Sequence, residues 1–471
     1  MSKKDNTEIE EIKEEKKILP AGSLPQSVLD INKKYKTTKI TTLDKAKSFI
    51  LKRMFSGSIL MDELSGGGWG YKRIHLLFGG RSAGKNALLN QTIAYNQRLC
   101  RHCMGILPHF YNGDDRHAMF LKYVLNVQEC KCDNSESKKF FVLDYEKSLA
   151  IEDSKIIIIR DITDNKSGEK VIEEYYEEQI EKFNLLTEKE NLQENEQIEL
   201  KVMEKWFKNL TIESNEIFKE STTDYLIKCG VLINELLVAD PPDIEDGTEM
   251  IINMIREAQV DGIILDSIQA AFPRRVKDRN SADETMGVEA KANGLLLRHV
   301  CSSFAANDLT NEREAYKPAF FITSQLRSSI GGFVTKQDTY SGGNALHHLT
   351  DIAVELKREG FLKIDGTDST TFKDDFYGQK VRLRTDKNKL AAPGGMQEYN
   401  YYFKDADNYK VGEIDHISEI ITLGVEKGRI ERAGAYYTLS TGDKFQGMQK
   451  LVEFCRSNPE FIGKVYKNIK G

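Results

Sequence analysis

The segment Ile74-His-Leu-Leu-Phe-Gly-Gly-Arg-Ser-Ala-Gly-Lys-Asn86 constrains the fold more than any other part of this 471-residue chain. Its apolar start is typical of a buried strand, and a helical pattern from Ala87 to about Leu99 follows its glycine-rich loop. In such a loop, backbone N–H groups converge on phosphate oxygens, a lysine reaches the terminal phosphates, and the helix N-terminus adds positive charge. An ordinary glycine turn is the alternative, but the flanking strand and helix disfavour it. The predicted phosphate-binding residues are Gly79, Gly80, Arg81, Ser82, Ala83, Gly84, Lys85 and Asn86.

The residue after the lysine departs from the usual phosphate-loop pattern. A Ser or Thr is expected there, because its hydroxyl ligates the Mg²⁺ of the nucleotide, but this chain has Asn86. An amide oxygen can ligate a hard cation, yet the side chain is bulkier than a hydroxyl. We therefore expect a nucleotide to bind, and we expect the placement of Mg²⁺ to be altered and hydrolysis to be slow.

Composition narrows the class of protein. Hydrophobic residues make up 40% and charged residues 30% of the chain, which is ordinary for a globular protein. No apolar run approaches the roughly 18 residues of a membrane span, and the N-terminus lacks the apolar core of a signal peptide. A cytoplasmic protein without membrane contact is expected. The net charge of −6 gives no overall indication of nucleic-acid binding, although a local basic path is compatible with it.

The order of apolar segments predicts an α/β fold. Runs at Phe140–Glu146, Gly262–Asp266 and Ala319–Gln325 read as buried parallel strands, and helical patterns lie between them. Strands alternating with helices imply a mostly parallel, doubly wound sheet. We divide the chain into an N-terminal arm at 1–52, a core at 53–407 that contains insertions at 100–132 and 150–222, and a small C-terminal domain at 408–471.

The two insertions differ in character. The acidic one, 150–222, has apolar residues at helical spacing among acids and lysines and reads as a helical hairpin preceded by a short strand. A solvated ornament on its own domain is favoured over a partner-binding arm. The other insertion carries Cys100-x-x-Cys103 and Cys130-x-Cys132, a spacing that suits a structural zinc site with four thiolate ligands. Unligated thiols are the alternative, and His102, His109 or His117 could replace one cysteine. Cys229, Cys301 and Cys455 are expected to be core or surface thiols.

Several segments, taken in order, resemble the RecA family of ATP-dependent strand-exchange recombinases. They include Ile263-Ile-Leu-Asp-Ser267, Ser324-Gln-Leu-Arg327 and Asp386-Lys-Asn-Lys389. The complete set of similar segments is Ser56 to Ile74, Val260 to Ala270, Ser324 to Gly331, Gly342 to Leu346, Asp386 to Pro393 and Gly424 to Tyr437. The resemblance implies a RecA-like ATPase core, a polymerisation region in the N-terminal arm and a small α/β C-terminal domain. The acidic C-terminal tail of that family is missing here, and the family has no cysteine module.

The strand-end residues and the resemblance together suggest roles in catalysis. Asp266 ends an apolar strand, where its carboxylate can hold the Mg²⁺ of a nucleotide, although a capping role is the alternative. Glu146 resembles the glutamate that activates the attacking water, with Asp144 as the nearby alternative. Gln325 resembles the residue that senses the terminal phosphate; a buried structural glutamine is the other interpretation.

Three further residues take roles from the resemblance alone. Lys387 and Lys389 are similar to lysines that reach the nucleotide of the neighbouring subunit and offset charge developing during phosphoryl transfer. Such a head-to-tail arrangement generates a helical filament. Tyr225 resembles the aromatic residue that stacks on adenine, but the preceding insertion leaves a core tyrosine as an equal alternative.

Two segments are predicted to contact DNA. The first, about Phe272 to Met286, has four cations in seven residues from Pro273 to Arg279, which suits counterion release from phosphates. The second, Ile330 to about Ser341, combines glycines with an aromatic and a cation and suits stacking on bases. Mobile surface loops are the alternative for both. The predicted contact residues are Arg274, Arg275, Lys277, Arg279, Arg327, Ile330, Gly331, Gly332, Phe333, Lys336, Gly342, Gly343 and Asn344.

The favoured function is therefore a recombinase in DNA recombination and repair that uses ATP, Mg²⁺ and a structural Zn²⁺. It would form helical filaments of many copies on single-stranded DNA and pair that strand with double-stranded DNA. A divergent, viral version fits the two insertions. The alternatives are a weakly or non-hydrolysing paralogue that acts as a mediator or scaffold, which Asn86 favours, and a hexameric DNA helicase.

Overall fold

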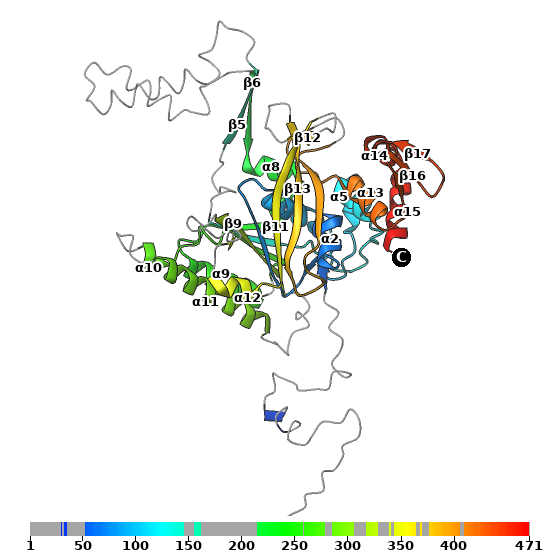
Figure 1. Cartoon of the computed structure of the whole chain (residues 1–471). Coiled ribbons are helices and arrows are strands. Elements are labelled where there is room, and N and C mark those ends of the chain that lie inside the picture. Colours follow the sequence, from blue (N-terminus) through cyan, green and yellow to red (C-terminus); the bar gives the residue numbers. More distant parts are fainter. Residues whose placement is uncertain are drawn as a thin grey trace, which may run out of the picture.

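A large mixed sheet forms the centre of the molecule (Figure 1). The computed structural model describes residues 52–145, 155–161, 214–257, 259–277, 285–305, 317–327, 339–340, 343–363, 368–369, 376–405 and 409–470, with residues 30, 33 and 34. The strand order is β14-β13-β11-β3-β9-β8-β4-β7, with β10 added to β9 and β12 to β11. The strands are β3 (Ile74–Gly79), β4 (Phe140–Asp144), β7 (Leu236–Ala239), β8 (Gly262–Asp266), β9 (Ala319–Arg327), β10 (Thr339–Tyr340), β11 (Ile352–Lys363), β12 (Asp368–Ser369), β13 (Phe376–Asn388) and β14 (Met396–Tyr402).

The neighbouring strands from β11 to β7 all run parallel, whereas β13 and β14 continue the sheet antiparallel. The three strands expected from their apolar runs are confirmed as β4, β8 and β9. In a parallel sheet the carboxyl ends of all strands meet at one edge. The register places Gly79 beside Gln325 and Asp144 beside Asp266 at that edge.

Helices cover both faces of the sheet, which explains why its strands are apolar without alternation. On β3, Leu77 belongs to one buried cluster, and Leu76 and Phe78 belong to the other. The first face packs against α2 (Ile59–Ser65) and α3 (Lys85–Gln97), and the second packs against α9 (Ile244–Glu257), α11 (Thr285–Ala305) and α12 (Gly343–Leu349). This arrangement confirms the predicted doubly wound α/β class. The remaining short elements of the core are β1 (Arg53–Met54), β2 (Trp69–Gly70), α8 (Thr222–Lys228), η1 (Ile233–Glu235) and α10 (Arg274–Lys277).

The cysteine-bearing insertion folds beside the C-terminal end of α3. It contains α4 (Pro108–Tyr111) and α5 (Arg116–Tyr123). Asp115 caps α5 by accepting a hydrogen bond from the Ala118 amide at 2.9 Å, and its carboxylate also lies 2.8 Å from the Arg98 guanidinium. The insertion is thereby fixed to the end of the helix that begins at the phosphate loop.

The acidic insertion has two strands rather than the one expected. β5 (Lys155–Asp161) matches the predicted short strand, and β6 (Ser214–Ser221) pairs with it antiparallel. We did not predict β6, because its charged residues among few apolar ones give no clear strand pattern. The predicted helical hairpin falls within 162–213, outside the described residues.

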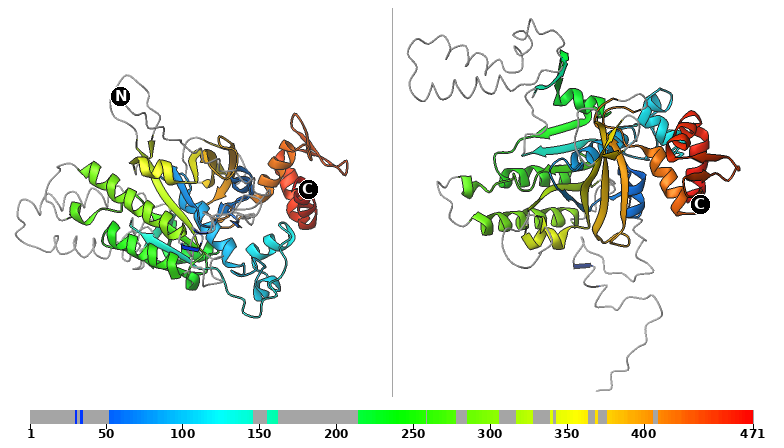
Figure 2. Two further views of the ribbon diagram at one scale, coloured as in Figure 1. Left: turned by 90° about the horizontal axis from the view of Figure 1, so that it is seen from below. Right: turned by 45° about the horizontal axis from the view of Figure 1, so that its top comes forward.

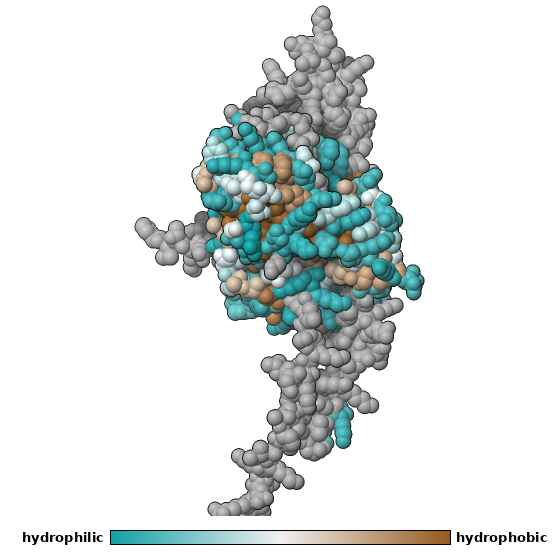
Figure 3. Space-filling view, turned by 90° about the vertical axis from the view of Figure 1, so that its right-hand side faces the viewer, coloured by the Kyte–Doolittle hydropathy of each residue, from teal (hydrophilic) through white to brown (hydrophobic). Residues whose placement is uncertain are grey.

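The C-terminal segment forms a small α/β unit. It comprises α13 (His416–Glu426), β15 (Glu431–Ala433), β16 (Tyr436–Thr438), β17 (Lys444–Gln446), α14 (Met448–Ser457) and α15 (Pro459–Lys470). Its apolar residues share one buried cluster with α2, α3 and the sheet, so the predicted boundary at 408 does not coincide with a break in the core. Figure 2 shows this unit next to α5, and Figure 3 shows the same side, where apolar patches lie among hydrophilic residues.

Within the described ranges, no helix is both long and apolar enough to cross a membrane.

Candidate nucleotide and metal sites

The phosphate loop joins β3 to α3, as the sequence predicts. Two glycines are needed there for different reasons. A Cβ atom on Gly79 would lie 2.1 Å from the carbonyl oxygen of Leu356, so the loop passes too close to β11 for any side chain. Gly84, just before α3, has a φ of 94°, which favours glycine. The helix begins at Lys85, two residues earlier than expected. The Lys85 ammonium donates to the carbonyls of Gly79 at 3.3 Å and Gly80 at 3.0 Å.

Asn86 and Asp266, predicted from distant parts of the sequence, are in contact. The Asn86 Nδ2 group donates to Asp266 Oδ2 at 2.8 Å. The hydroxyl of Thr323 lies 2.5 Å from Asp266 Oδ1. The amide, carboxylate and hydroxyl oxygens of these three side chains are the hard donors that Mg²⁺ prefers. The donor set therefore fits the magnesium ion of a bound nucleotide.

These groups line one cavity of about 390 Å³. The loop from Arg81 to Asn86 forms one wall, and Asp266, Thr323 and Gln325 lie along the carboxyl edge of the sheet. Tyr225, which the sequence also predicted for the nucleotide, lines the same cavity. The Tyr225 hydroxyl is hydrogen-bonded to the Tyr401 hydroxyl, so this contact also fixes the Tyr225 side chain within the protein.

Three residues of the cavity wall were not predicted from the sequence. Gln379 of β13, Tyr401 of β14 and the following Phe403 also line the cavity. Burial raises the pKa of Tyr401, which keeps its hydroxyl neutral. None of these residues follows an apolar strand or belongs to a recognisable motif. Only the antiparallel pairing of β13 with β14 brings them to the phosphate loop.

Gln325 joins the nucleotide cavity to the second predicted DNA segment. Its side chain is exposed and lines the cavity, while its carbonyl accepts a hydrogen bond from Gln269 Nε2 at 2.9 Å. β9 continues to Arg327, which pairs with Thr339 of β10. The predicted residues Ile330, Gly331, Gly332, Phe333, Lys336 and Gly342, and the side chain of Arg327, lie outside the described residues.

The residue predicted to activate water, Glu146, also lies outside the described residues. Its alternative, Asp144, is the last residue of β4 and is 1% exposed. Asp144 stands beside Asp266 in the strand register, at the same edge as the phosphate loop. Both candidates therefore remain predictions.

Lys387 and Lys389 are not near the nucleotide cavity of their own chain. Lys387 Nζ donates to the His348 carbonyl at 3.0 Å, and Lys389 Nζ lies 3.5 Å from Asp351 Oδ1. Asp351 also accepts a hydrogen bond from the Ile74 amide at 3.0 Å, so the two lysines lie near the first residue of β3. The phosphate loop follows the last residue of that strand, about 16 Å away at 3.3 Å per residue. Partial burial and the neighbouring Lys389 lower the pKa of Lys387.

The first predicted DNA segment is only partly described. Arg274 begins α10 and is bound to acids: Nε lies 2.7 Å from Asp243 Oδ2, and a terminal nitrogen lies 2.5 Å from Asp246 Oδ1. These hydrogen bonds raise the pKa of Arg274. Arg275 is exposed, whereas Arg279 and the side chain of Lys277 lie outside the described residues. Gly343 and Asn344 are exposed at the start of α12.

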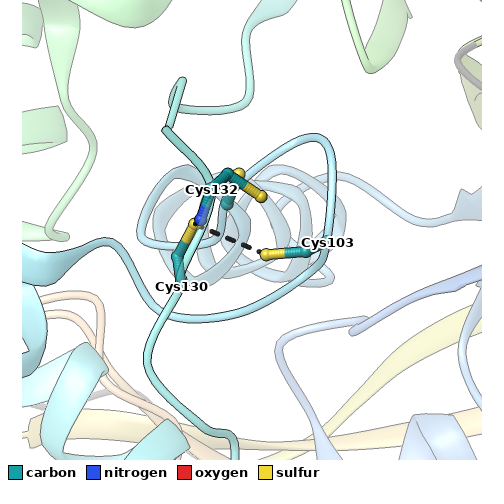
Figure 4. Close-up of side chains that lie close together, drawn as sticks. Cys103, Cys130 and Cys132 are labelled. Carbon is teal, nitrogen blue, oxygen red and sulfur yellow. Dashed lines mark hydrogen bonds between the residues drawn. The ribbon is translucent and has the colours of Figure 1, made fainter. Parts of the chain in front are cut away.

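The four predicted zinc ligands come together in space. The sulfur atoms of Cys100, Cys103, Cys130 and Cys132 all lie within 4.8 Å of one another. The sulfur atoms of Cys103 and Cys130 are 3.4 Å apart, and Figure 4 shows the Cys103 side chain pointing toward Cys130. A tetrahedral zinc with bonds of about 2.3 Å to sulfur separates its ligands by roughly 3.8 Å, which this set fits. Among the described residues, no other cluster of three or more potential ligands lies this close together. No histidine belongs to it, and His117 instead packs 4.6 Å from the Tyr95 ring.

The protein environment shifts the pKa values of two of these thiols in opposite directions. Burial opposes ionisation of Cys100, but hydrogen bonds from the backbone of Cys103 and His102 outweigh burial and lower its pKa to about 7. Burial raises the pKa of Cys130 to about 12. Because a bound metal deprotonates its thiol ligands, a zinc ion would hold all four as thiolates.

The family model and the known proteins reported below are all of RecA. The model of the RecA N-terminal domain matches residues 216–406. Protein RecA 1 of Myxococcus xanthus is 29% identical over 247 residues, which is 52% of this chain and 65% of that protein. Protein RecA of Streptomyces coelicolor is 29% identical over 52% of this chain and 60% of that protein, and Protein RecA of Frankia alni is 30% identical over 52% and 64%. The matched part thus spans less than two thirds of these relatives.

The family match covers many of the predicted site residues. Residues 216–406 include Tyr225, Asp266, Gln325, Lys387 and Lys389. The phosphate loop and the four clustered cysteines precede the matched range. Their assignment rests on the local geometry described above.

Proposed function

We propose that this chain is a divergent RecA-family protein, an ATP-dependent DNA recombinase that acts as a helical filament; its matches to the RecA N-terminal domain and to RecA proteins support the proposal. One observation carries the proposal. The nucleotide-facing groups lie at the carboxyl edge of the sheet, and Lys387 and Lys389 lie near its opposite edge. A single copy cannot bring the two sets together, but a neighbouring copy can.

Within one copy, we propose that the cavity holds ATP with Mg²⁺. The loop amides and Lys85 bind the phosphates, and Tyr225 with Tyr401 and Phe403 forms the wall for the base. Asp266 and Asn86 would hold the Mg²⁺, which would supply positive charge beside the phosphates. Glu146 or Asp144 accepts the proton of the attacking water.

Between copies, Lys387 and Lys389 of one subunit contact the nucleotide of the next. Their positive charge stabilises the negative charge that develops on the transferred phosphoryl group. Because this contact joins two different surfaces, it can repeat from copy to copy, and it gives an open helix when the rotation between copies does not close a ring. A nucleotide at each junction then links filament assembly to ATP.

We propose that the filament binds single-stranded DNA through the segments that follow β8 and β9, and then pairs it with double-stranded DNA. Gln325 supports this link, since it lines the nucleotide cavity and precedes the second segment by only a few residues. A contact between Gln325 and the terminal phosphate of ATP can therefore affect the segment after β9 that we propose binds DNA. The four clustered cysteines would hold zinc in a structural role, because four thiolate ligands would leave no open position for chemistry.

The proposal is tested by steady-state ATPase measurements with and without single-stranded DNA, together with electron microscopy. We expect DNA-stimulated hydrolysis and helical filaments with ATP, and loss of both in Lys85→Ala. Closed rings on DNA would instead indicate the helicase. No DNA-stimulated hydrolysis would contradict the recombinase.

A mediator that binds ATP but scarcely hydrolyses it is the second candidate. The hydrogen bond of Asn86 to Asp266 favours it, because it places an amide donor where a metal-ligating hydroxyl is usual. Asn86→Thr separates the two functions. A recombinase with altered metal binding gains hydrolysis in this variant, whereas a mediator stays inactive with DNA and ATP.

A further inference from the structure

The hydroxyl that the phosphate loop lacks at Asn86 has a counterpart on a neighbouring strand. Thr323 lies on β9 next to the end of β8, since Leu265 pairs with Ile322 in the register and Asp266 and Thr323 follow them. The Thr323 side chain is 0% exposed and lines the nucleotide cavity. Nothing in the sequence motif at the loop points to this residue.

The contacts of Thr323 define where its proton goes. Its oxygen lies 2.5 Å from Asp266 Oδ1 and 3.5 Å from the Leu265 carbonyl oxygen. A threonine hydroxyl has one proton, and the shorter contact to a carboxylate is the stronger hydrogen bond. The proton therefore points to Asp266, so the buried hydroxyl of Thr323 acts on the cavity through this carboxylate.

Asp266 is thus held on both of its oxygens. Thr323 donates to Oδ1, and Asn86 donates to Oδ2 at 2.8 Å. Hydrogen bonds to both oxygens of a carboxylate fix its orientation. With a donor on each oxygen, the carboxylate is better suited to hold a metal through its bound water than to wrap around the metal directly.

We propose that Thr323 is a positioning residue for the magnesium ion of the bound nucleotide and replaces the hydroxyl absent from position 86. This inference rests on the proposed nucleotide site. Thr323 acts by orienting the Asp266 carboxylate, to which its hydroxyl donates a hydrogen bond. The effect of losing its hydroxyl is therefore confined to the magnesium-dependent part of nucleotide binding.

The test compares nucleotide affinity with and without magnesium, in the full chain, using a fluorescent ADP analogue. Thr323→Val keeps the shape and removes the hydroxyl, whereas Thr323→Ser keeps the hydroxyl. We expect Thr323→Val to raise the dissociation constant about tenfold or more in Mg²⁺ and to leave it unchanged in EDTA, as loss of a hydrogen bond to a charged group predicts. Thr323→Ser should behave like the unaltered protein.

Two results overturn the inference. Equal weakening with Mg²⁺ and with EDTA would show a merely structural role, and an unchanged dissociation constant in Mg²⁺ would show no role. If the unaltered protein itself binds no nucleotide, the proposed function fails rather than this inference alone. Circular dichroism of each variant identifies any loss of folding.

A second comparison uses Asn86→Thr, which returns a hydroxyl to the loop. If Thr323 compensates for Asn86, the cost of Thr323→Val in Mg²⁺ should shrink at least severalfold in the Asn86→Thr background. Equal cost in both backgrounds would show that the two positions act independently and would refute the compensation.

Discussion

The stability of the strand that leads into the phosphate loop should depend on pH through one buried histidine. His75, the second residue of β3, is 0% exposed and packs against the rings of Trp69 and Phe321 at 5.1 and 5.3 Å. Its Nε2 group donates to the Gly70 carbonyl at 2.9 Å, and its buried Nδ1 has no hydrogen-bond partner. Protonation would place a charge on Nδ1 in this apolar setting. Burial is the main cause that lowers the pKa of His75 from 6.5 to about 4.

The sign and size of the effect follow from these two pKa values. Asp351 nearby favours protonation, while Arg53 and Arg73 oppose it. Between pH 6.5 and 4 the unfolded chain carries a proton on this histidine and the folded chain does not, so acid favours unfolding. The contribution is fully present above pH 6.5 and is lost as the pH falls toward 4. Lowering the pH from 7 to 5 should cost about 2 kcal/mol of unfolding free energy from this group alone.

Urea unfolding at pH 7 and pH 5 measures this contribution. His75→Gln keeps a donor for Gly70 but does not titrate, so its stability should fall about 2 kcal/mol less between the two pH values than that of the unaltered protein. His299→Gln, at an exposed histidine, is the matched control and should retain the pH dependence of the unaltered protein. The reasoning is refuted if His75→Gln and the unaltered protein lose equal stability on acidification.

Three further predictions concern the sites. Gly79→Ala should weaken nucleotide binding at least tenfold and cost about 1–3 kcal/mol of stability, because its Cβ would clash with Leu356; Gly80→Ala, which meets nothing within 4 Å, should fold as stably as the unaltered protein, and calorimetry compares them. Cys132→Ser should lower the zinc content below one per chain and reduce the melting temperature, while Cys301→Ser changes neither; metal analysis and thermal unfolding decide. Arg275→Ala should weaken single-stranded DNA binding more than Arg274→Ala, because Arg274 is already paired with Asp243 and Asp246; equal losses in fluorescence anisotropy would contradict this.

The sequence predicted the parts of the fold that depend on local pattern. β3, β4, β8 and β9 were recognisable because a parallel strand covered on both faces is apolar throughout. The two cysteine pairs were recognisable from their spacing, and the structure brings their sulfur atoms together. Asn86 and Asp266 were identified separately, and their contact follows from the register of adjacent strands.

The rest depends on long-range packing that a pattern does not encode. Gln379, Tyr401 and Phe403 reach the nucleotide cavity only because β13 and β14 extend the sheet antiparallel beside β11. The sequence shows Thr323 only as a residue of an apolar strand. Its hydroxyl lies next to Asp266 because of the register between β9 and β8. The acids around Arg274 come from the start of α9, about 30 residues earlier in the chain, so the sequence suggested a free cation.

A mixing experiment tests the shared nucleotide site most directly. Lys85→Ala lacks the phosphate-binding lysine, and Lys387→Ala/Lys389→Ala lacks the lysines proposed to act on the neighbour, so each variant alone should hydrolyse almost no ATP with single-stranded DNA. In an equal mixture, about one quarter of the junctions pair an intact loop with intact lysines, because both sets come from different copies. We therefore predict recovery of about one quarter of the DNA-dependent ATPase activity of the unaltered protein. A mixture that stays as inactive as its two components would contradict a nucleotide site built from two neighbouring subunits.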